Sequence, residues 1–411
     1  MGRLTRKELI AGAAAVGVVA GCGGSKKAAP DPRGWAAVKA QFPLSPDVHH
    51  LDAFVLASHP RDVRVAIDTH RRGLDADPNG YVREHEAELD KRVTDAAARY
   101  LGVNATDVAL TDSTTMGLGL VYRGIHVEGE AVATEHDFYA THEALRLRFG
   151  RLRKIRLYDD PANATVESIV EAVRSGIDSD TGLLALTWVH SSTGVRLPLA
   201  EIAASLSGRC LLVVDGVHAL GAVDEDVNGL CDVLVAGTHK WLGGPRGTGL
   251  IWSTQWGRLQ PVIPSFATEP YVSWLEGRPL QRATYDAAVL TPGGFHSFEH
   301  RWALAQAFEY QTRLGRDKVA ERIRTLATRL KEGLAELPKV HVVTPMSPSL
   351  SAGIVCFDVG GLRAGEVVER LAGDKIAASV TPYATEHVRL GPGIWNDEAD
   401  VDAAIRAVRR L

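Results

Sequence analysis

The feature that most constrains the fold is a set of continuous apolar runs in the middle of the chain. They read TGLLALTWVH, CLLVVDG, DVLVAGTH and TGLIWS, at residues 181–190, 210–216, 232–239 and 248–253. A strand with one buried face alternates apolar and polar residues, so an unbroken apolar run indicates a strand covered on both faces. Helical patterns alternate with strand patterns from residue 60 onward, as in β-α-β units. We therefore predict an α/β fold with a large, doubly wound, mostly parallel sheet.

The pattern changes near residue 295. A long helical stretch at 298–337, with a break expected at Gly315, is followed by short strand patterns and two further helical patterns. This order indicates a small α+β domain. We predict a large domain at residues 30–295, which includes an N-terminal arm, and a small C-terminal domain at 296–411. A chain of 411 residues is long enough for both.

Residues 1–29 have the composition of an export segment. A basic start precedes an apolar stretch from Leu9 to Ala20, and the run VAGC resembles a bacterial lipobox. We predict cleavage before Cys22, a lipid anchor on that cysteine and a flexible tether up to residue 29. The predicted location is a membrane-anchored lipoprotein on the periplasmic or cell-surface side. An uncleaved membrane anchor is the alternative, and the sequence leaves Sec and Tat export both open.

Composition narrows the class of partner. The formal net charge is −4 and no basic stripe is present, which argues against nucleic acid and favours a small-molecule substrate. The four cysteines (Cys22, Cys210, Cys231 and Cys356) lack the spacing of a metal site or of a disulfide framework. We therefore predict no metal site.

Polar side chains follow several of the predicted strands. LTDSTT places Ser113, Thr114 and Thr115 at the start of a helix, where hydroxyl and backbone N–H groups suit a phosphate, although plain N-capping explains them equally. His136 and Ser191 also come directly after apolar runs. In open parallel sheets, ligands bind at the carboxyl ends of the strands. Several such strand ends together indicate a binding site there.

Asp215 and Lys240 end two successive buried strands. A carboxylate at the end of an apolar strand needs a partner, which can be a metal, an arginine or a protonated ring nitrogen, unless it caps a turn. Lys240 lies in GTHKWLGGPRGTG, between a histidine and a tryptophan and before a glycine-rich turn. Taken alone, it is either a surface charge or a nucleophile held over a cofactor.

This order of aspartate and lysine resembles the pyridoxal phosphate enzymes of fold type I, and more closely the class V aminotransferase family. That family includes cysteine desulfurases and isopenicillin N epimerase-like proteins, and the resemblance runs from about residue 50 to the C-terminus. It implies pyridoxal 5'-phosphate as cofactor, with Lys240 as the Schiff-base lysine and Asp215 protonating the pyridine nitrogen. It also implies that Thr114 and Thr115 hold the phosphate and that His136, in TEHDFY, stacks on the ring.

The resemblance assigns further cofactor contacts. Ser191 stands where an asparagine near the ring hydroxyl is usual, and His218 occupies a position often held by glutamine. Thr238 and His239 accompany the lysine. Relatives often carry serine at Gly237, so the hydroxyl of Thr238 is expected to replace it.

Two C-terminal motifs complete the resemblance. LTPGG resembles a segment that reaches the phosphate of a neighbouring subunit, which implies a homodimer with a composite active site and a cofactor contact from Thr291. HVRLGPGIWN resembles the segment whose arginine holds a substrate carboxylate, which implies that Arg389 binds the amino-acid substrate.

The segment SVTPYATEHVR lacks the cysteine that desulfurases carry shortly before this arginine, which disfavours a desulfurase. We predict a pyridoxal phosphate-dependent enzyme that acts on an amino acid, either an aminotransferase or an epimerase. The alternatives are a C–S or other β-lyase, and a lipid-anchored, non-catalytic binding protein that retains the fold. An epimerase needs a second proton donor, for which His218 and Tyr139 are candidates.

Overall fold

The computed structural model describes residues 34–150, 152–281 and 285–411. The predicted signal, the lipobox with Cys22 and the tether lie outside the described residues. No helix within the described ranges is long and apolar enough to cross a membrane.

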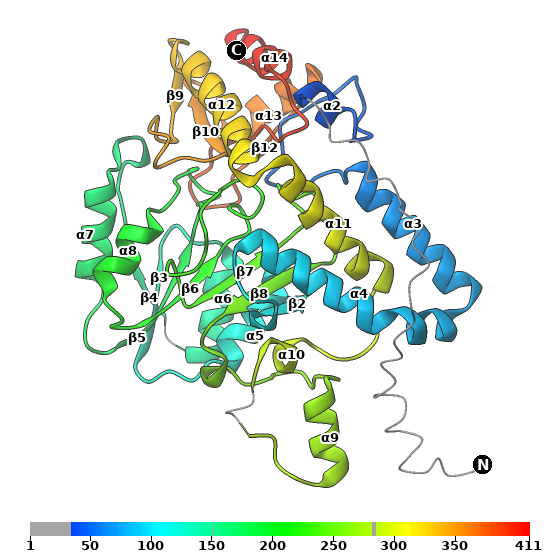
Figure 1. Ribbon diagram of the computed structural model, residues 1–411. Helices are drawn as coiled ribbons and strands as arrows, with labels where there is room; N and C mark the ends of the chain where they lie inside the picture. The colour runs from blue at the N-terminus through cyan, green and yellow to red at the C-terminus, as the bar shows by residue number, and fades with distance from the viewer. Residues whose placement is uncertain (1–33, 151, 282–284) are drawn as a thin grey trace.

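A seven-stranded sheet forms the centre of the molecule (Figure 1). β8 is antiparallel to both of its neighbours, and the pairs formed by β7, β6, β5, β3 and β4 are all parallel. This confirms the mostly parallel sheet. The strands, in spatial order, are β2 (Val108–Thr111), β8 (Gly249–Ser253), β7 (Val233–Gly237), β6 (Leu211–Asp215), β5 (Thr181–Thr187), β3 (Glu130–Thr134) and β4 (Arg153–Ile155).

Apolar residues on both faces of the strands explain the unbroken runs. Leu184, Leu212 and Leu234 pack into one core cluster. Their sequence neighbours Leu183, Val213 and Val233 pack into a second cluster. Because successive side chains of a strand point to opposite faces, each face of the sheet contributes to a separate core. The helices interspersed with these strands are α5 (Thr114–Gly124), α6 (Tyr139–Phe149), α7 (Val166–Gly176), α8 (Leu199–Leu206), α9 (Thr268–Glu276) and α10 (Ala287–Leu290).

Three long helices pack together beside the sheet (Figure 1). They are α3 (Arg61–Ala76), α4 (Pro78–Leu101) and α11 (Phe298–Leu314). α4 ends at Gly102, whose φ of 72° lies in the left-handed region that favours glycine. α11 lies beyond residue 296, yet it packs on α3 and α4 of the large domain. Gly315, with φ of 92°, separates α11 from α12 (Arg316–Ala335), as expected from the sequence.

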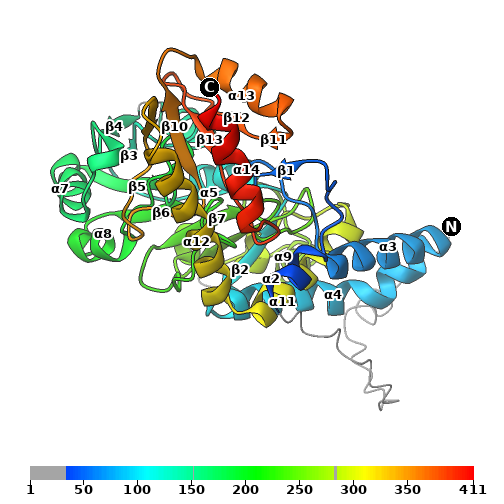
Figure 2. The same cartoon turned by 90° about the horizontal axis from the view of Figure 1, so that it is seen from above.

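A second, antiparallel sheet lies in the part of the chain predicted to form the small domain. Its strand order is β12 (Ser379–Val380), β13 (Val388–Leu390), β10 (Val355–Val359) and β9 (Val340–Val342). α12, α13 (Ala364–Gly373) and α14 (Glu398–Arg409) accompany it (Figure 2).

The N-terminal arm joins this small domain. β1 (His49–His50) pairs in parallel with β11 (Ile376–Ala377). Lys39, the last residue of α2 (Trp35–Lys39), donates to Asp397 and Asp400 near the start of α14, at 2.8 Å each. The arm therefore contacts the C-terminal end of the chain.

Candidate active site

A cavity of about 300 Å³ lies at the carboxyl ends of β5, β6 and β7. This is the position at which open α/β sheets bind ligands. The small domain contributes Arg389 of β13 and Pro382 to its wall. The lining residues are Phe54, Val55, Ser113, Thr114, Thr115, Phe138, Ala140, Thr187, Ser191, Asp215, Val217, His218, His239, Lys240, Pro382 and Arg389.

Lys240 presents a buried amine in this cavity. Its Nζ lies 3.3 Å from Nε2 of His218. Burial lowers the pKa of Lys240 to about 8, against the opposing effect of the negative charge of Asp215. Burial also lowers the pKa of His218 well below its usual value and that of His239 to about 4. Both imidazoles are therefore neutral at pH 7, and a substantial fraction of the lysine is the free, nucleophilic amine.

Asp215 ends β6 and is buried. Its Oδ1 accepts a hydrogen bond from the backbone N–H of Val217 at 3.0 Å. Burial raises the pKa of Asp215 to about 6, while the Val217 N–H and the charge of Lys240 act in the opposite direction. A carboxylate in this position favours a cationic partner such as a protonated ring nitrogen.

The N-terminus of α5 supplies hydroxyl groups to the same cavity. Ser113 caps the helix by accepting from the N–H of Met116 at 3.1 Å. Thr114 Oγ1 accepts from the N–H of Gly237 at 2.8 Å, which leaves its own hydroxyl proton for a ligand. A Cβ at Gly237 would lie 2.9 Å from this Oγ1, so Thr114 fills the space that a serine side chain would need. The arrangement suits a phosphate.

Arg389 is buried in the part of the cavity wall that β13 forms. Its guanidinium donates to Ser379 Oγ at 3.0 Å and to the carbonyl of Ser191 at 3.2 Å, and it lies 4.5 Å from the ring centre of Phe54. Aromatic packing and hydrogen bonds fix the guanidinium plane, which suits the recognition of a carboxylate.

Two predicted contacts are not in this cavity. His136 lines a neighbouring cavity of about 410 Å³ and stacks on Tyr158, with ring centres 4.0 Å apart. The phenylalanine side chains at the Lys240 cavity are Phe54 and Phe138, and the ring contact of His136 stays a prediction. The side chain of Thr238 is fully buried and its hydroxyl contacts Oγ1 of Thr248 at 2.5 Å, so its cofactor contact also stays a prediction.

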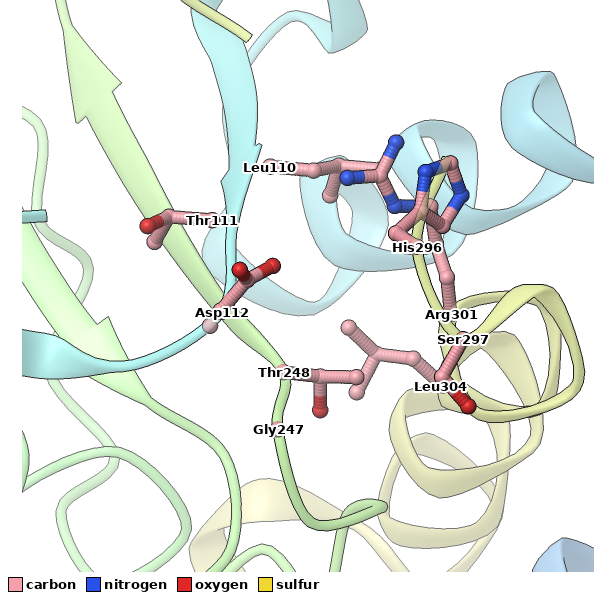
Figure 3. Close-up of a pocket in the computed structure, with 10 residues that line it drawn as sticks. Leu110, Thr111, Asp112, Gly247, Thr248, His296, Ser297, Arg301 and Leu304 are labelled. Carbon is pink, nitrogen blue, oxygen red and sulfur yellow. The ribbon is translucent and has the colours of Figure 1, made fainter. Parts of the chain in front are cut away.

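Thr291 lies apart from Lys240 within the chain. Its Oγ1 accepts from the N–H of Leu110 on β2 at 3.1 Å, and it lines a groove along α4 and α10. Arg301 lines both this groove and a small hollow at the end of β2, where its side chain lies beside that of His296 (Figure 3). Whether Thr291 reaches a cofactor in a second subunit stays a prediction.

Sequence reasoning missed several side chains of the site. Asp137 is buried and accepts from the backbone N–H groups of Thr134 and Thr187, both at 2.7 Å, so it ties the ends of β3 and β5 together. Tyr383 donates to or accepts from Ser191 Oγ at 2.7 Å. Asp137 could have been identified from the sequence, because it comes shortly after the end of a predicted strand. Tyr383 lies in an irregular segment, between strands of a different sheet.

The cavity fits pyridoxal phosphate. It combines a buried amine, a buried carboxylate, helix-terminal hydroxyls and an arginine. Two buried polar atoms in its wall, Thr187 Oγ1 and His218 Nδ1, have no hydrogen-bond partner within the described part of the chain. Buried polar groups are normally paired, so these atoms favour a polar ligand. Among the described residues, no group of three His, Cys, Asp or Glu side chains could hold a metal ion.

Comparisons with known proteins agree with this chemistry. The class V aminotransferase family model matches residues 80–403. The chain is 27% identical over 406 residues to isopenicillin N epimerase of Streptomyces clavuligerus, covering 92% of this chain and 98% of that protein. It is 28% identical over 395 residues to the enzyme of the same name from Amycolatopsis lactamdurans, and the match covers 86% of this chain and 95% of that protein. It is also 28% identical over 360 residues to a cysteine desulfurase of Enterobacter sp. (strain 638), and the match covers 80% of this chain and 84% of that protein.

Solved structures share the fold. The cystine C-S lyase C-DES, in complex with cysteine persulfide, has a TM-score of 0.80 at 20% identity and covers 90% of this chain and 100% of its own. A cysteine desulfurase from Thermococcus onnurineus NA1 has a TM-score of 0.77 at 20% identity, and the match covers 92% of this chain and 97% of that one. At this identity the likeness shows the fold, which is that of fold type I.

Proposed function

Because the chain belongs to the class V aminotransferase family and its cofactor is pyridoxal phosphate, we propose that it is an epimerase that inverts the α-carbon of an amino acid. The observation that carries the proposal is the joint placement of Lys240, Asp215 and Arg389 around one cavity. The similarity to two isopenicillin N epimerases over nearly their whole length supports it.

Each of these residues has a definite task in such a reaction. The guanidinium of Arg389 binds the α-carboxylate of the substrate. Lys240 Nζ, with its pKa lowered to about 8, removes the proton from the α-carbon as a general base. The carboxylate of Asp215 holds a proton on the pyridine nitrogen. When bound, pyridoxal phosphate supplies an electron-accepting ring that spreads the negative charge of the α-carbon.

A C–S or other β-lyase is the second candidate. It is favoured by the cystine C-S lyase among the solved structures. The segment before Arg389 reads SVTPYATEHVR and contains no cysteine, which separates this chain from enzymes that use a cysteine there as a nucleophile.

The experiment is incubation of the loaded protein with both enantiomers of each proteinogenic amino acid in deuterated water. An epimerase exchanges the α-hydrogen and forms the other enantiomer without keto acid. Keto acid together with the aminated cofactor identifies an aminotransferase, and pyruvate with a released β-group identifies a lyase. A protein that stays colourless with added pyridoxal phosphate is instead a binding protein that retains the fold.

We also propose a homodimer in which Thr291 contacts the cofactor of the second subunit. A groove of about 790 Å³ that includes Thr291 runs along α4 and α10, and the exposed aromatic residues Phe266, Trp274 and Phe295 support the proposal. Light scattering after size exclusion should give twice the chain mass. Thr291→Val should then lose cofactor faster on dialysis, and a monomer that keeps its cofactor would contradict the proposal.

The N-terminal sequence supports a further proposal, that the protein is an exported lipoprotein anchored through Cys22. Cells fed labelled palmitate should incorporate the label into the wild-type protein and not into Cys22→Ser. Recovery of both forms from the cytoplasmic fraction would contradict it.

A further inference from the structure

Ser191 and Tyr383 form a partly buried hydroxyl pair at the edge of the candidate active site, where Tyr383 itself lines the neighbouring cavity. Ser191 lines the cavity that contains Lys240, and its Oγ lies 2.7 Å from the phenol oxygen of Tyr383. The ring of Tyr383 packs edge-on against Phe138, another lining residue, with ring centres 6.2 Å apart. The pair is therefore held in place by the wall of the cavity.

This pair and Lys240 approach the cavity from different sides. Lys240 follows β7 and contacts His218, which follows β6. Ser191 follows β5, and Phe138 follows β3 on its far side. The spatial order of these strands is β7, β6, β5 and β3. The Ser191–Tyr383 pair therefore lies on the β5 side of the cavity, two strands away from Lys240 after β7.

Inversion of an α-carbon needs a proton acceptor on one face and a proton donor on the other. We propose that the Ser191–Tyr383 hydroxyl pair is the proton carrier on the face opposite Lys240. The inference rests on the proposed epimerase function. It assigns a task to Tyr383 that neither the family resemblance nor the comparisons supply.

The proton steps balance as follows in one direction. Lys240 Nζ takes the α-hydrogen of the substrate as a proton and becomes an ammonium. The hydroxyl of Ser191 gives its proton to the other face of the α-carbon while the phenol of Tyr383 passes its proton to Ser191, so that a phenolate forms. One C–H bond breaks and one forms, and no oxidant is needed. Water returns the proton from Lys240 to Tyr383 before the next turnover, and the opposite enantiomer uses the two groups in reverse.

The electrostatic surroundings suit this task. Burial and the charges of Asp137 and Asp215 raise the pKa of Tyr383 and keep the phenol protonated, while the hydrogen bond to Ser191 and the charge of Arg389 act in the opposite direction. Arg389 also donates to the carbonyl of Ser191 at 3.2 Å. The residue that binds the substrate carboxylate therefore also positions the proton carrier.

The two donors considered from sequence are less suitable. His218 lies 3.3 Å from Lys240 and is on the same side as the base. Tyr139 is 70% exposed at the start of α6, whereas Tyr383 is partly buried and is hydrogen-bonded to the lining residue Ser191. Its substitution by phenylalanine is a matched control for the loss of a tyrosine hydroxyl.

The test compares Tyr383→Phe and Ser191→Ala with wild type and Tyr139→Phe, using the first amino acid that the wild-type protein inverts. In deuterated water, Tyr383→Phe should lower the rate of inversion by about 10²- to 10⁴-fold, the usual contribution of a general acid. It should keep α-hydrogen exchange of the enantiomer whose proton faces Lys240. Tyr139→Phe should match wild type.

Inversion at the wild-type rate in Tyr383→Phe would overturn this inference and leave the proposed function intact. Loss of inversion in Tyr139→Phe would also overturn it. Absence of inversion by the wild-type protein with every amino acid would overturn the proposed function and the inference together.

A second measurement does not depend on turnover. Cofactor-free protein labelled with ¹³C at tyrosine Cζ should give a Tyr383 resonance, which is assigned by its loss in Tyr383→Phe. Ser191→Ala should shift that resonance, because it removes the hydrogen-bond partner. An unchanged resonance in Ser191→Ala would show that the hydroxyl pair does not exist.

Discussion

Covalent capture of pyridoxal phosphate by Lys240 should depend on pH in a way that the structure determines. Only the neutral amine attacks an aldehyde. Burial lowers the pKa of Lys240 to about 8 from the ordinary value of 10.5. The capture rate of the cofactor-free protein should therefore rise with pH and reach half of its maximum near pH 8 rather than near pH 10.5.

The size of the effect follows from the two pKa values. At pH 7 an amine with a pKa of about 8 is roughly 9% neutral, whereas one with a pKa of 10.5 is about 0.03% neutral. Lys240 should therefore react about 300-fold faster at pH 7 than an exposed lysine of equal intrinsic reactivity.

Two substitutions should move the midpoint in opposite directions. The negative charge of Asp215 raises the pKa of Lys240, and the positive charge of Arg389 lowers it. Asp215→Asn should therefore shift the midpoint of capture below that of wild type, and Arg389→Gln should shift it above. The assay is stopped-flow absorbance of the cofactor band from pH 6 to 10.

Lys331 provides an internal control. Its pKa is also lowered to about 8 by burial, but its Nζ donates to the carbonyl of Pro345 and to Ser351 Oγ, both at 2.7 Å. Lys240→Met, which keeps Lys331, should show no capture. A wild-type midpoint near 10.5, or shifts of the same sign in Asp215→Asn and Arg389→Gln, would refute the reasoning.

Three further predictions concern binding and stability. Asp137→Ala leaves two buried backbone N–H groups without an acceptor, so urea unfolding of the cofactor-free protein should show a loss of roughly 2–5 kcal/mol; a loss below 1 kcal/mol would contradict this. Arg389→Lys removes a planar guanidinium held over Phe54, so KM for the amino acid should rise at least about tenfold with a smaller change in kcat. Burial would raise the pKa of Asp400, but hydrogen bonds from Lys39 and His49 lower it to about 2 from 3.8. The stability that this carboxylate provides is present above pH 4 and is lost as the pH falls toward 2, and Asp400→Asn should remove roughly 1–2 kcal/mol of that pH dependence in acid unfolding curves.

The boundaries of most central elements could be predicted from local sequence. Gly102 and Gly315 end helices because both adopt a positive φ. Asp215 and Lys240 lie together at the site for a topological reason. Parallel strands that are neighbours in a sheet bring their carboxyl ends to one edge, and β6 and β7 are such neighbours.

The local sequence does not predict which side chains just beyond a strand end point into the cavity. His136 and Phe138 lie in one short segment after β3, yet only Phe138 lines the Lys240 cavity. Thr238 is next but one to Lys240, and its hydroxyl contacts Thr248 instead of the cavity. No period of two or 3.6 residues applies outside regular elements, so the fold of the turn decides which residue faces the ligand.

The sequence by itself determined the mostly parallel sheet, the position of the lysine and aspartate at its edge, and the absence of a cysteine before Arg389. These depend on hydrophobic periodicity and on strand order, which are local or nearly local properties. Only the tertiary structure decided that Tyr383 meets Ser191, that Arg389 donates to the carbonyl of Ser191, and that the N-terminal arm pairs with β11. These contacts join segments 192, 198 and 327 residues apart, and packing between two domains fixes them rather than any pattern along the chain.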